Sequence, residues 1–185
     1  MDTVLGLFFS EERNRSMQPL YDSEAVRPMW EGLAECGVTP LKSSKEVDEA
    51  VRKEGTTLVM VNSVCGCAGG IARPGLSVAL QHKTIPDHLT MVFAGVDREA
   101  TERAREHMVG VAPSSPSIAL FKDGKLVHML ERRHIERLTE QDVAQNLADA
   151  FDEHCSRQGP SVAPEVYEKV RDRQLPLYGS GGGHP

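Results

Sequence analysis

Apolar positions along the chain follow two spacings, one typical of strands and one typical of helices. Residues 56–64 form an apolar, β-branched run that is bounded by Gly55 and by a turn, which predicts a buried central strand. Residues 71–80 then carry apolar side chains at helical spacing and predict a helix packed against that strand. Pro74 should kink this helix, because proline lacks the N–H that the helical ladder requires. A second buried strand is predicted over 89–93.

The other periodic segments complete an alternating order of strands and helices. Ser43 and Glu46 form a capping box at the start of one helix. Pro28 should kink the first helix of the chain, and Asp123-Gly124 is the turn signal of a closing hairpin. This order implies a mainly parallel sheet that is covered on both faces, to which the hairpin adds antiparallel strands. Further helices are predicted over 21–36, 43–54, 97–109 and 139–155, and further strands over 38–41, 117–121 and 126–130.

The chain of 185 residues divides into one domain and two flanking segments. Residues 1–16 show no clear period and are expected to be a flexible N-terminal segment. Residues 17–155 hold all the predicted sheet elements. The C-terminal extension, 156–185, is rich in proline and ends in GSGGGHP. We expect this extension to be largely disordered at its end, with one helical turn over 166–170.

Charge and hydropathy limit the classes of partner. The formal net charge of −6 argues against a nucleic-acid partner. No apolar run approaches the length that spans a membrane, and the apolar residues 5–9 lack the basic start and the length of a signal peptide. We therefore expect a cytoplasmic protein with no membrane partner. In a reducing compartment, cysteines are more often catalytic or metal-binding than structural bridges.

Cys65-Gly66-Cys67 lies where the central strand ends and the next helix begins. The first turn of a helix has unpaired N–H groups and a positive dipole end that stabilise a thiolate, which is the attacking form of a thiol. Cys65 should have the lower pKa and attack, and Cys67 should resolve the mixed disulfide. Helical residues two apart point to nearly opposite sides, so closing a disulfide should require a non-helical kink at Gly66. The strained bond should make an oxidising couple.

Two other interpretations of the Cys-Gly-Cys remain open at this point. The two cysteines are compatible with small buried hydrophobic residues, which the motif favours less than a redox pair. They are also compatible with half of a metal site, for which His154, Cys155 and Cys36 are the remote candidate ligands.

The element order resembles the thioredoxin fold, with a cysteine pair opening the second sheet helix and a proline before the hairpin. Ser115-Pro116-Ser117, followed by IALFKDGK, stands where that fold has a cis proline facing the active cysteines. The resemblance implies that Pro116 is cis, which is energetically accessible for X–Pro bonds. It implies a thioredoxin-like three-layer α/β/α sandwich with a mixed central sheet. An extra N-terminal helix and a C-terminal tail are added to it.

Four motifs are similar to those of the bacilliredoxins, namely VNSVCGCAGGIARPG, VFAGVDREAT, PSSPSIAL and FDEHC. This resemblance covers roughly residues 17–155 and implies a thiol–disulfide oxidoreductase that removes bacillithiol from protein mixed disulfides. It assigns the attacking role to Cys65 and the resolving role to Cys67, with bacillithiol as co-substrate and no bound cofactor. The implied partners are bacillithiolated cytosolic proteins. The motif FDEHC matches the usual C-terminus of the family, so 156–185 is an addition.

The resemblance also assigns residues that contact the substrate. Gly66 and the backbone of Ser115 and Pro116 should hold the incoming disulfide in an extended form. Arg73 and the basic run Arg132-Arg133-His134 could attract the carboxylates of bacillithiol, although we expect them to be solvated surface charges.

Other functions and the remaining thiols complete the set of expectations. A general protein disulfide oxidoreductase or isomerase would use the same residues on peptide disulfides. A metal-binding protein would use Cys65 and Cys67 as soft ligands, although we predict no metal site. Cys155 lies at a helix end, where the dipole disfavours a thiolate, and we expect it and Cys36 to be inert.

Overall fold

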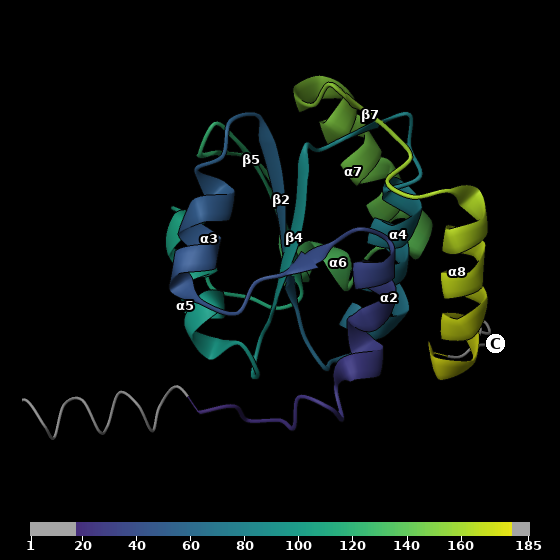
Figure 1. Cartoon of the computed structure of the whole chain (residues 1–185), viewed down its shortest axis with the longest axis horizontal. Helices are drawn as coiled ribbons and strands as arrows, with labels where there is room; N and C mark the ends of the chain where they lie inside the picture. Colours follow the sequence, from purple (N-terminus) through teal and green to yellow (C-terminus); the bar gives the residue numbers. More distant parts are fainter. Residues whose placement is uncertain (1–17, 179–185) are drawn as a thin grey trace, which may run out of the picture.

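Strand β2 (Thr56–Asn62) is the central strand of a five-stranded sheet (Figure 1). This computed structural model describes residues 18–178, so the predicted flexible segment 1–16 lies outside the described residues. The strand order is β1-β4-β2-β5-β6, in which β1 and β4 run parallel to β2, and β5 and β6 add the antiparallel hairpin. The other strands of this sheet are β1 (Thr39–Pro40), β4 (His88–Phe93), β5 (Ser117–Lys122) and β6 (Lys125–Leu130).

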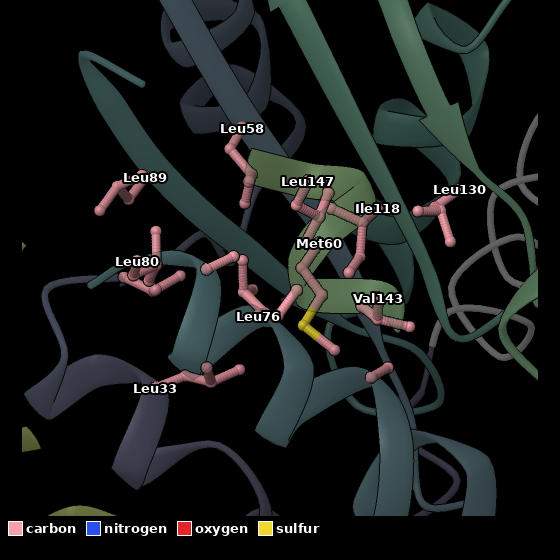
Figure 2. Packing of buried hydrophobic residues seen from close by; sticks show 14 of the residues in the cluster. Leu33, Leu58, Met60, Leu76, Leu80, Leu89, Ile118, Leu130, Val143 and Leu147 are labelled. Atoms are coloured by element: carbon pink, nitrogen blue, oxygen red, sulfur yellow. The ribbon is translucent and has the colours of Figure 1, made fainter. Parts of the chain in front are cut away.

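Helices cover both faces of the sheet, which confirms the predicted three-layer sandwich. All seven residues of β2 are buried, as expected for a strand between two helical layers. Its side chains alternate between the faces: Leu58 and Met60 point into the cluster with Leu76 and Leu147 (Figure 2), whereas Val59 lies in the cluster on the opposite face. The first layer contains α2 (Glu31–Glu35), α4 (Arg73–Ala79) and α7 (Glu140–His154), and the second contains α3 (Ser44–Val51) and α5 (Arg98–His107).

Local sequence signals set several boundaries as predicted. Ser43 and Glu46 form the capping box of α3. Asp123 and Gly124 have positive φ angles of 49° and 79° at the turn between β5 and β6, which is the conformation that an Asp-Gly hairpin turn requires.

The first predicted helix, over 21–36, is wrong as a single element. The structure instead has a 3₁₀ turn, η1 (Arg27–Met29), followed by the short helix α2. Pro28 lies at the start of η1, and Trp30, with φ −134° and ψ −20°, separates η1 from α2. A proline at this position cannot donate to a preceding turn, so the predicted kink is a complete break.

The kink predicted at Pro74 takes the form of a wide π turn, η2 (Ala68–Ala72), that leads directly into α4. The Arg73 N–H donates to the carbonyl of Ala68, five residues earlier. Pro74 is the second residue of α4, which follows this wider turn directly. Val78, which we expected on the packed face of this helix, is instead 37% exposed.

The C-terminal extension is folded as far as residue 178. Strand β7 (Arg157–Gln158) pairs with β3 (Thr84–Ile85), and α8 (Pro164–Tyr178) is a helix of 15 residues that lies beside α2 (Figure 1). The prediction of one helical turn is therefore wrong. Tertiary packing stabilises this helix, which sequence periodicity did not indicate. Val170 is 1% exposed, and Tyr167 packs against the main core cluster.

The extension also forms specific polar contacts with the domain. Ser161 Oγ donates to the carbonyl of Cys36 at 2.8 Å, and the N–H of Gly159 donates to the carbonyl of Lys83 at 2.9 Å. Arg173 forms an ion pair with Glu35 of α2. These contacts attach the extension both through the segment that joins β7 to α8 and through α8 itself.

Replacement of Val170 by Asp should detach α8, because burial of an unpaired carboxylate costs several kcal/mol. We expect amide protection in α8 to fall by more than about tenfold in hydrogen exchange, and the buried thiol of Cys36 to become reactive toward iodoacetamide. The matched control is Val166→Asp on the same helix, because Val166 is already 38% exposed. Equal exchange rates in the two variants would show that packing at Val170 does not hold α8.

Candidate functional site: a cysteine pair at the end of the central strand

The cysteine pair lies at the predicted strand-to-helix junction. Strand β2 ends at Asn62, and the helical backbone begins at Gly66. The carbonyl of Cys65 accepts hydrogen bonds from the N–H groups of Ala68 and Gly69, at 3.1 and 3.2 Å. Cys65 therefore occupies the residue before the first helical turn, and Cys67 lies within that turn.

The two sulfurs face each other in the dithiol form. Cys65 Sγ lies 2.9 Å from Cys67 Sγ and 3.3 Å from Ser63 Oγ. In this dithiol form Gly66 is helical and its φ is not positive. The kink predicted at Gly66 concerns closure of the Cys65–Cys67 disulfide and stays a prediction. Because Cys65 precedes the helix, the rule for two helical side chains two residues apart does not apply to the dithiol pair.

The environment separates the pKa values of the two thiols. Burial raises the pKa of Cys65, but hydrogen bonds from Cys67, Ser63 and the Ala68 N–H, together with the charge of Arg132, outweigh burial and lower it. Burial also raises the pKa of Cys67, and the hydrogen bond to Cys65 and the charge of Cys65 raise it further. The direction of both shifts agrees with the expectation that Cys65 is the more readily ionised thiol.

Iodoacetamide should alkylate Cys65 first when the reduced full chain is treated at pH 7. A thiolate is the reactive form, and the lowered pKa of Cys65 gives it a larger thiolate fraction than an ordinary thiol has at the same pH. Burial raises the pKa of Cys36 to about 11 and also raises the pKa of Cys155, so these thiols should react last. Peptide mass spectrometry over a pH series measures the order, and labelling of Cys67 ahead of Cys65 would contradict it.

The loop before β5 lies at the same end of the sheet. The Ser115–Pro116 bond is cis, as the resemblance implied. Ser117, the first residue of β5, pairs with Val61 of β2, so Pro116 lies next to the end of the strand that leads to Cys65.

The basic residues that the sequence singled out have different environments. In α6 (Arg132–Ile135), Arg132 is half-exposed and donates to the carbonyl of Ser115 at 3.4 Å. It is solvated, as expected, and its charge favours the thiolate form of both Cys65 and Cys67, although the pKa of Cys67 is raised overall. Arg133 is exposed and pairs with Glu131 at 2.7 Å. His134 accepts a hydrogen bond from the Glu131 N–H within the capping box of α6.

Arg73 is neither a solvated surface charge nor an anion-attracting side chain at the surface, so both expectations for it are wrong. It is 2% exposed, and its Nη1 donates to Asn62 Oδ1 and to the carbonyl of Ser63, both at 2.9 Å. Sequence reasoning named Arg73 but missed its burial. The available signal was that Arg73 is the only charged residue between Thr56 and Leu80.

The described part of the chain has neither a cluster of three metal ligands nor a membrane-spanning helix. Among residues 18–178, no group of three or more His, Cys, Asp or Glu side chains is arranged to hold a metal ion. No helix in that part is long and apolar enough to cross a membrane.

Comparison with known proteins gives consistent matches. Residues 21–155 match the sequence family described as disulphide isomerase. The chain is 51% identical over 136 residues to a bacilliredoxin of Staphylococcus saprophyticus and 53% identical over 137 residues to one of Geobacillus kaustophilus, in each case covering 74% of this chain and 94% of the relative. Oxidised mitochondrial thioredoxin 3 of Saccharomyces cerevisiae aligns with a TM-score of 0.44 and 16% identity over 65% of this chain and 98% of that one.

The sheet order, the cysteine pair at the end of the central strand and the family match together define a thiol–disulfide oxidoreductase with a thioredoxin-like fold. The extension from residue 156 lies outside the matched range. Within this class, the chain belongs to the bacilliredoxin family.

Proposed function

We propose that this protein removes bacillithiol from mixed disulfides of cytosolic proteins, with Cys65 as the attacking thiol and Cys67 as the resolving thiol. The observation that carries the proposal is the pair itself. The sulfurs lie 2.9 Å apart, and their pKa values are shifted in opposite directions. The relatives at about half identity are bacilliredoxins, which supports bacillithiol as the co-substrate. The proposal requires no bound cofactor.

The reaction consists of two thiol–disulfide exchanges. The Cys65 thiolate attacks the bacillithiol sulfur of a protein–S–S–bacillithiol, a Cys65–bacillithiol bond forms, and the protein leaves as a thiolate that takes up a proton. In the second exchange, the thiolate of Cys67 attacks the sulfur of Cys65 and releases bacillithiol. Alternatively, free bacillithiol attacks the bacillithiol sulfur, which forms bacillithiol disulfide and releases Cys65 as a thiolate. A Cys65–Cys67 disulfide returns to the dithiol by accepting two electrons from an external thiol reductant.

The surroundings of Cys65 leave room for the incoming disulfide. Gly66 is exposed, and a Cβ built on it would meet nothing within 4 Å. In the proposal, the substrate passes over Gly66, and the backbone of Ser115 and Pro116 holds it in an extended form on the other side. Both contacts use main-chain atoms, so the site would accept many protein sequences.

Arg132 is the basic residue that could select the co-substrate. Its contacts with the Ser115 carbonyl and with Glu136 are long, at 3.4 and 3.5 Å. Its guanidinium is therefore available to a stronger anionic partner. Since its charge reaches both sulfurs, we propose that it attracts a carboxylate of the bacillithiol that is bonded to Cys65.

Intact mass spectrometry of the Cys67→Ser protein tests the proposal. The variant is incubated separately with a bacillithiol-modified client protein and with the same client modified by glutathione. We expect a bacillithiol adduct that peptide mapping places on Cys65, and a glutathione adduct that forms at least about tenfold more slowly. Equal rates would contradict the specificity for bacillithiol, and an adduct on Cys36 or Cys155 would contradict the assignment of the attacking thiol.

A general disulfide isomerase is the second candidate, and the description of the matched sequence family favours it. This function would use the same two cysteines on peptide disulfides. The reduced protein should then restore activity to a scrambled-disulfide substrate protein in the absence of any small thiol. If it does not, and a bacillithiol adduct forms on Cys65, removal of bacillithiol would be the only one of the two functions that remains.

A further inference from the structure

A buried arginine lies beneath the turn that leads from β2 to the cysteine pair. Arg73 is among the largest fully buried side chains of the described residues. It follows the π turn directly, and one extra residue in a helical turn rotates the positions after it by about 100°. The π turn before Pro74 thus determines the direction in which the Arg73 side chain leaves the helix. That direction is toward the end of β2, where Nη1 meets Asn62 Oδ1 and the Ser63 carbonyl.

The groups that Arg73 contacts also bond to each other. Asn62 Oδ1 accepts a second hydrogen bond from the Ser63 N–H at 2.8 Å, and Asn62 Nδ2 donates to the carbonyl of Met29 at 3.0 Å. One guanidinium nitrogen therefore joins the last side chain of β2 to the first carbonyl after it. Hydrogen bonds inside a buried network restrict the backbone segments that they join.

The turn that Arg73 and Asn62 hold places the side chain of Ser63 beside the sulfur of Cys65. Ser63 Oγ lies 3.3 Å from Cys65 Sγ, and the backbone atoms that orient the Ser63 side chain are those that Arg73 and Asn62 hold. A hydroxyl that donates to a thiolate stabilises the ionised form. This hydrogen bond depends on the position of Ser63, because a small rotation of the turn would move the hydroxyl out of range.

We propose that Arg73 is a positioning residue for the reaction: its hydrogen bonds to Asn62 and Ser63 hold the turn in the arrangement in which the Ser63 hydroxyl stabilises the Cys65 thiolate. This inference rests on the proposed role of Cys65 as the attacking thiol. It adds a residue that touches neither sulfur, and it assigns Ser63 the direct contact.

The pH dependence of Cys65 alkylation tests this inference in the full-length reduced chain. The variants are Arg73→Met, which removes the donors and keeps an unbranched side chain, Arg73→Lys, Ser63→Ala, and the double variant Arg73→Met/Ser63→Ala. We expect Arg73→Met and Ser63→Ala each to move the midpoint of alkylation upward by about one pH unit, which is about a tenfold loss of thiolate at low pH. Arg73→Lys, which keeps a charged donor, should restore part of the shift.

Non-additivity distinguishes this role from general stabilisation of the fold. If Arg73 acts through Ser63, the double variant should shift the midpoint no further than the larger single variant. Additive shifts, or an unchanged midpoint in a folded Arg73→Met protein, would overturn the inference. Circular dichroism checks folding. If Arg73→Met does not fold, Arg73→Lys with and without Ser63→Ala provides the same double-mutant cycle.

The alkylation assay contains no bacillithiol, so it separates this inference from the proposed function. A shifted midpoint with no bacillithiol adduct on the Cys67→Ser protein would support the role of Arg73 and contradict the proposed function. A bacillithiol adduct on the Cys67→Ser protein, with an unshifted midpoint of alkylation in the Arg73 variants, would support the proposed function and overturn the role of Arg73.

Discussion

Replacement of Cys65 by Ser should lower the rate of thiol–disulfide exchange by at least about 10³-fold. Serine keeps the size of the side chain, but its hydroxyl does not ionise at neutral pH, so the groups that lower the pKa of Cys65 have no thiolate to stabilise. The measurement is release of bacillithiol from a modified client protein, followed by intact mass. Because the fold depends little on this partly exposed sulfur, circular dichroism should show an unchanged structure.

The other cysteines serve as controls for that result. Cys67→Ser should retain the first exchange and accumulate the mixed disulfide on Cys65, because the resolving thiol is missing. Cys36→Ser and Cys155→Ser should leave the rate within about twofold of the parent protein, since burial raises the pKa of both thiols and both lie at the ends of helices. Exchange that survives in the Cys65→Ser protein at the parent rate would contradict the assigned mechanism.

Gly75→Ala should lower the free energy of unfolding by about 2 kcal/mol, as overpacking of a close helix crossing does. Gly75 lies in α4 against the start of α7. A Cβ on Gly75 would lie 2.7 Å from Val143 Cβ and 2.8 Å from the carbonyl oxygen of Glu140. The second contact is with backbone, so a change of rotamer cannot relieve it, and α7 would have to move away from α4.

Gly70→Ala is the matched control for this prediction. Gly70 belongs to the π turn that precedes α4, and a Cβ there would meet nothing within 4 Å. Alanine should therefore raise the free energy of unfolding by up to about 1 kcal/mol through its higher helix propensity. Urea denaturation with unchanged m-values compares the two variants. Equal changes in the two proteins would show that the α4–α7 contact does not require glycine.

The elements that local signals specify were predicted well. The apolar run of β2, the capping box at Ser43 and Glu46 and the Asp123-Gly124 turn all occur where the sequence predicts them. The capping box and the turn involve residues within three positions of one another, and they depend on hydrogen bonds and backbone angles that the local segment forms by itself. The run of β2 is one continuous segment of seven residues, and its apolar composition marks it as buried before its partner strands are known.

The order of pKa values at the cysteine pair was also predicted, but only part of its cause was. The first helical turn lowers the pKa of Cys65 through the Ala68 N–H, as expected. The contributions of Ser63 and Arg132 depend on the turn after β2 and on a helix that lies far away in sequence. Periodicity and spacing contain no information on how these groups approach the sulfur of Cys65.

The sequence by itself determined the sheet, the boundaries of most of its helices and the location of the cysteine pair, because short-range spacing encodes them. Tertiary structure alone decided the burial of Arg73 and the docking of α8. The physical reason is that burial depends on which surfaces meet. Arg73 is buried because the π turn aims it at the end of β2, and α8 is helical because Val170 and Tyr167 find an apolar surface beside α2.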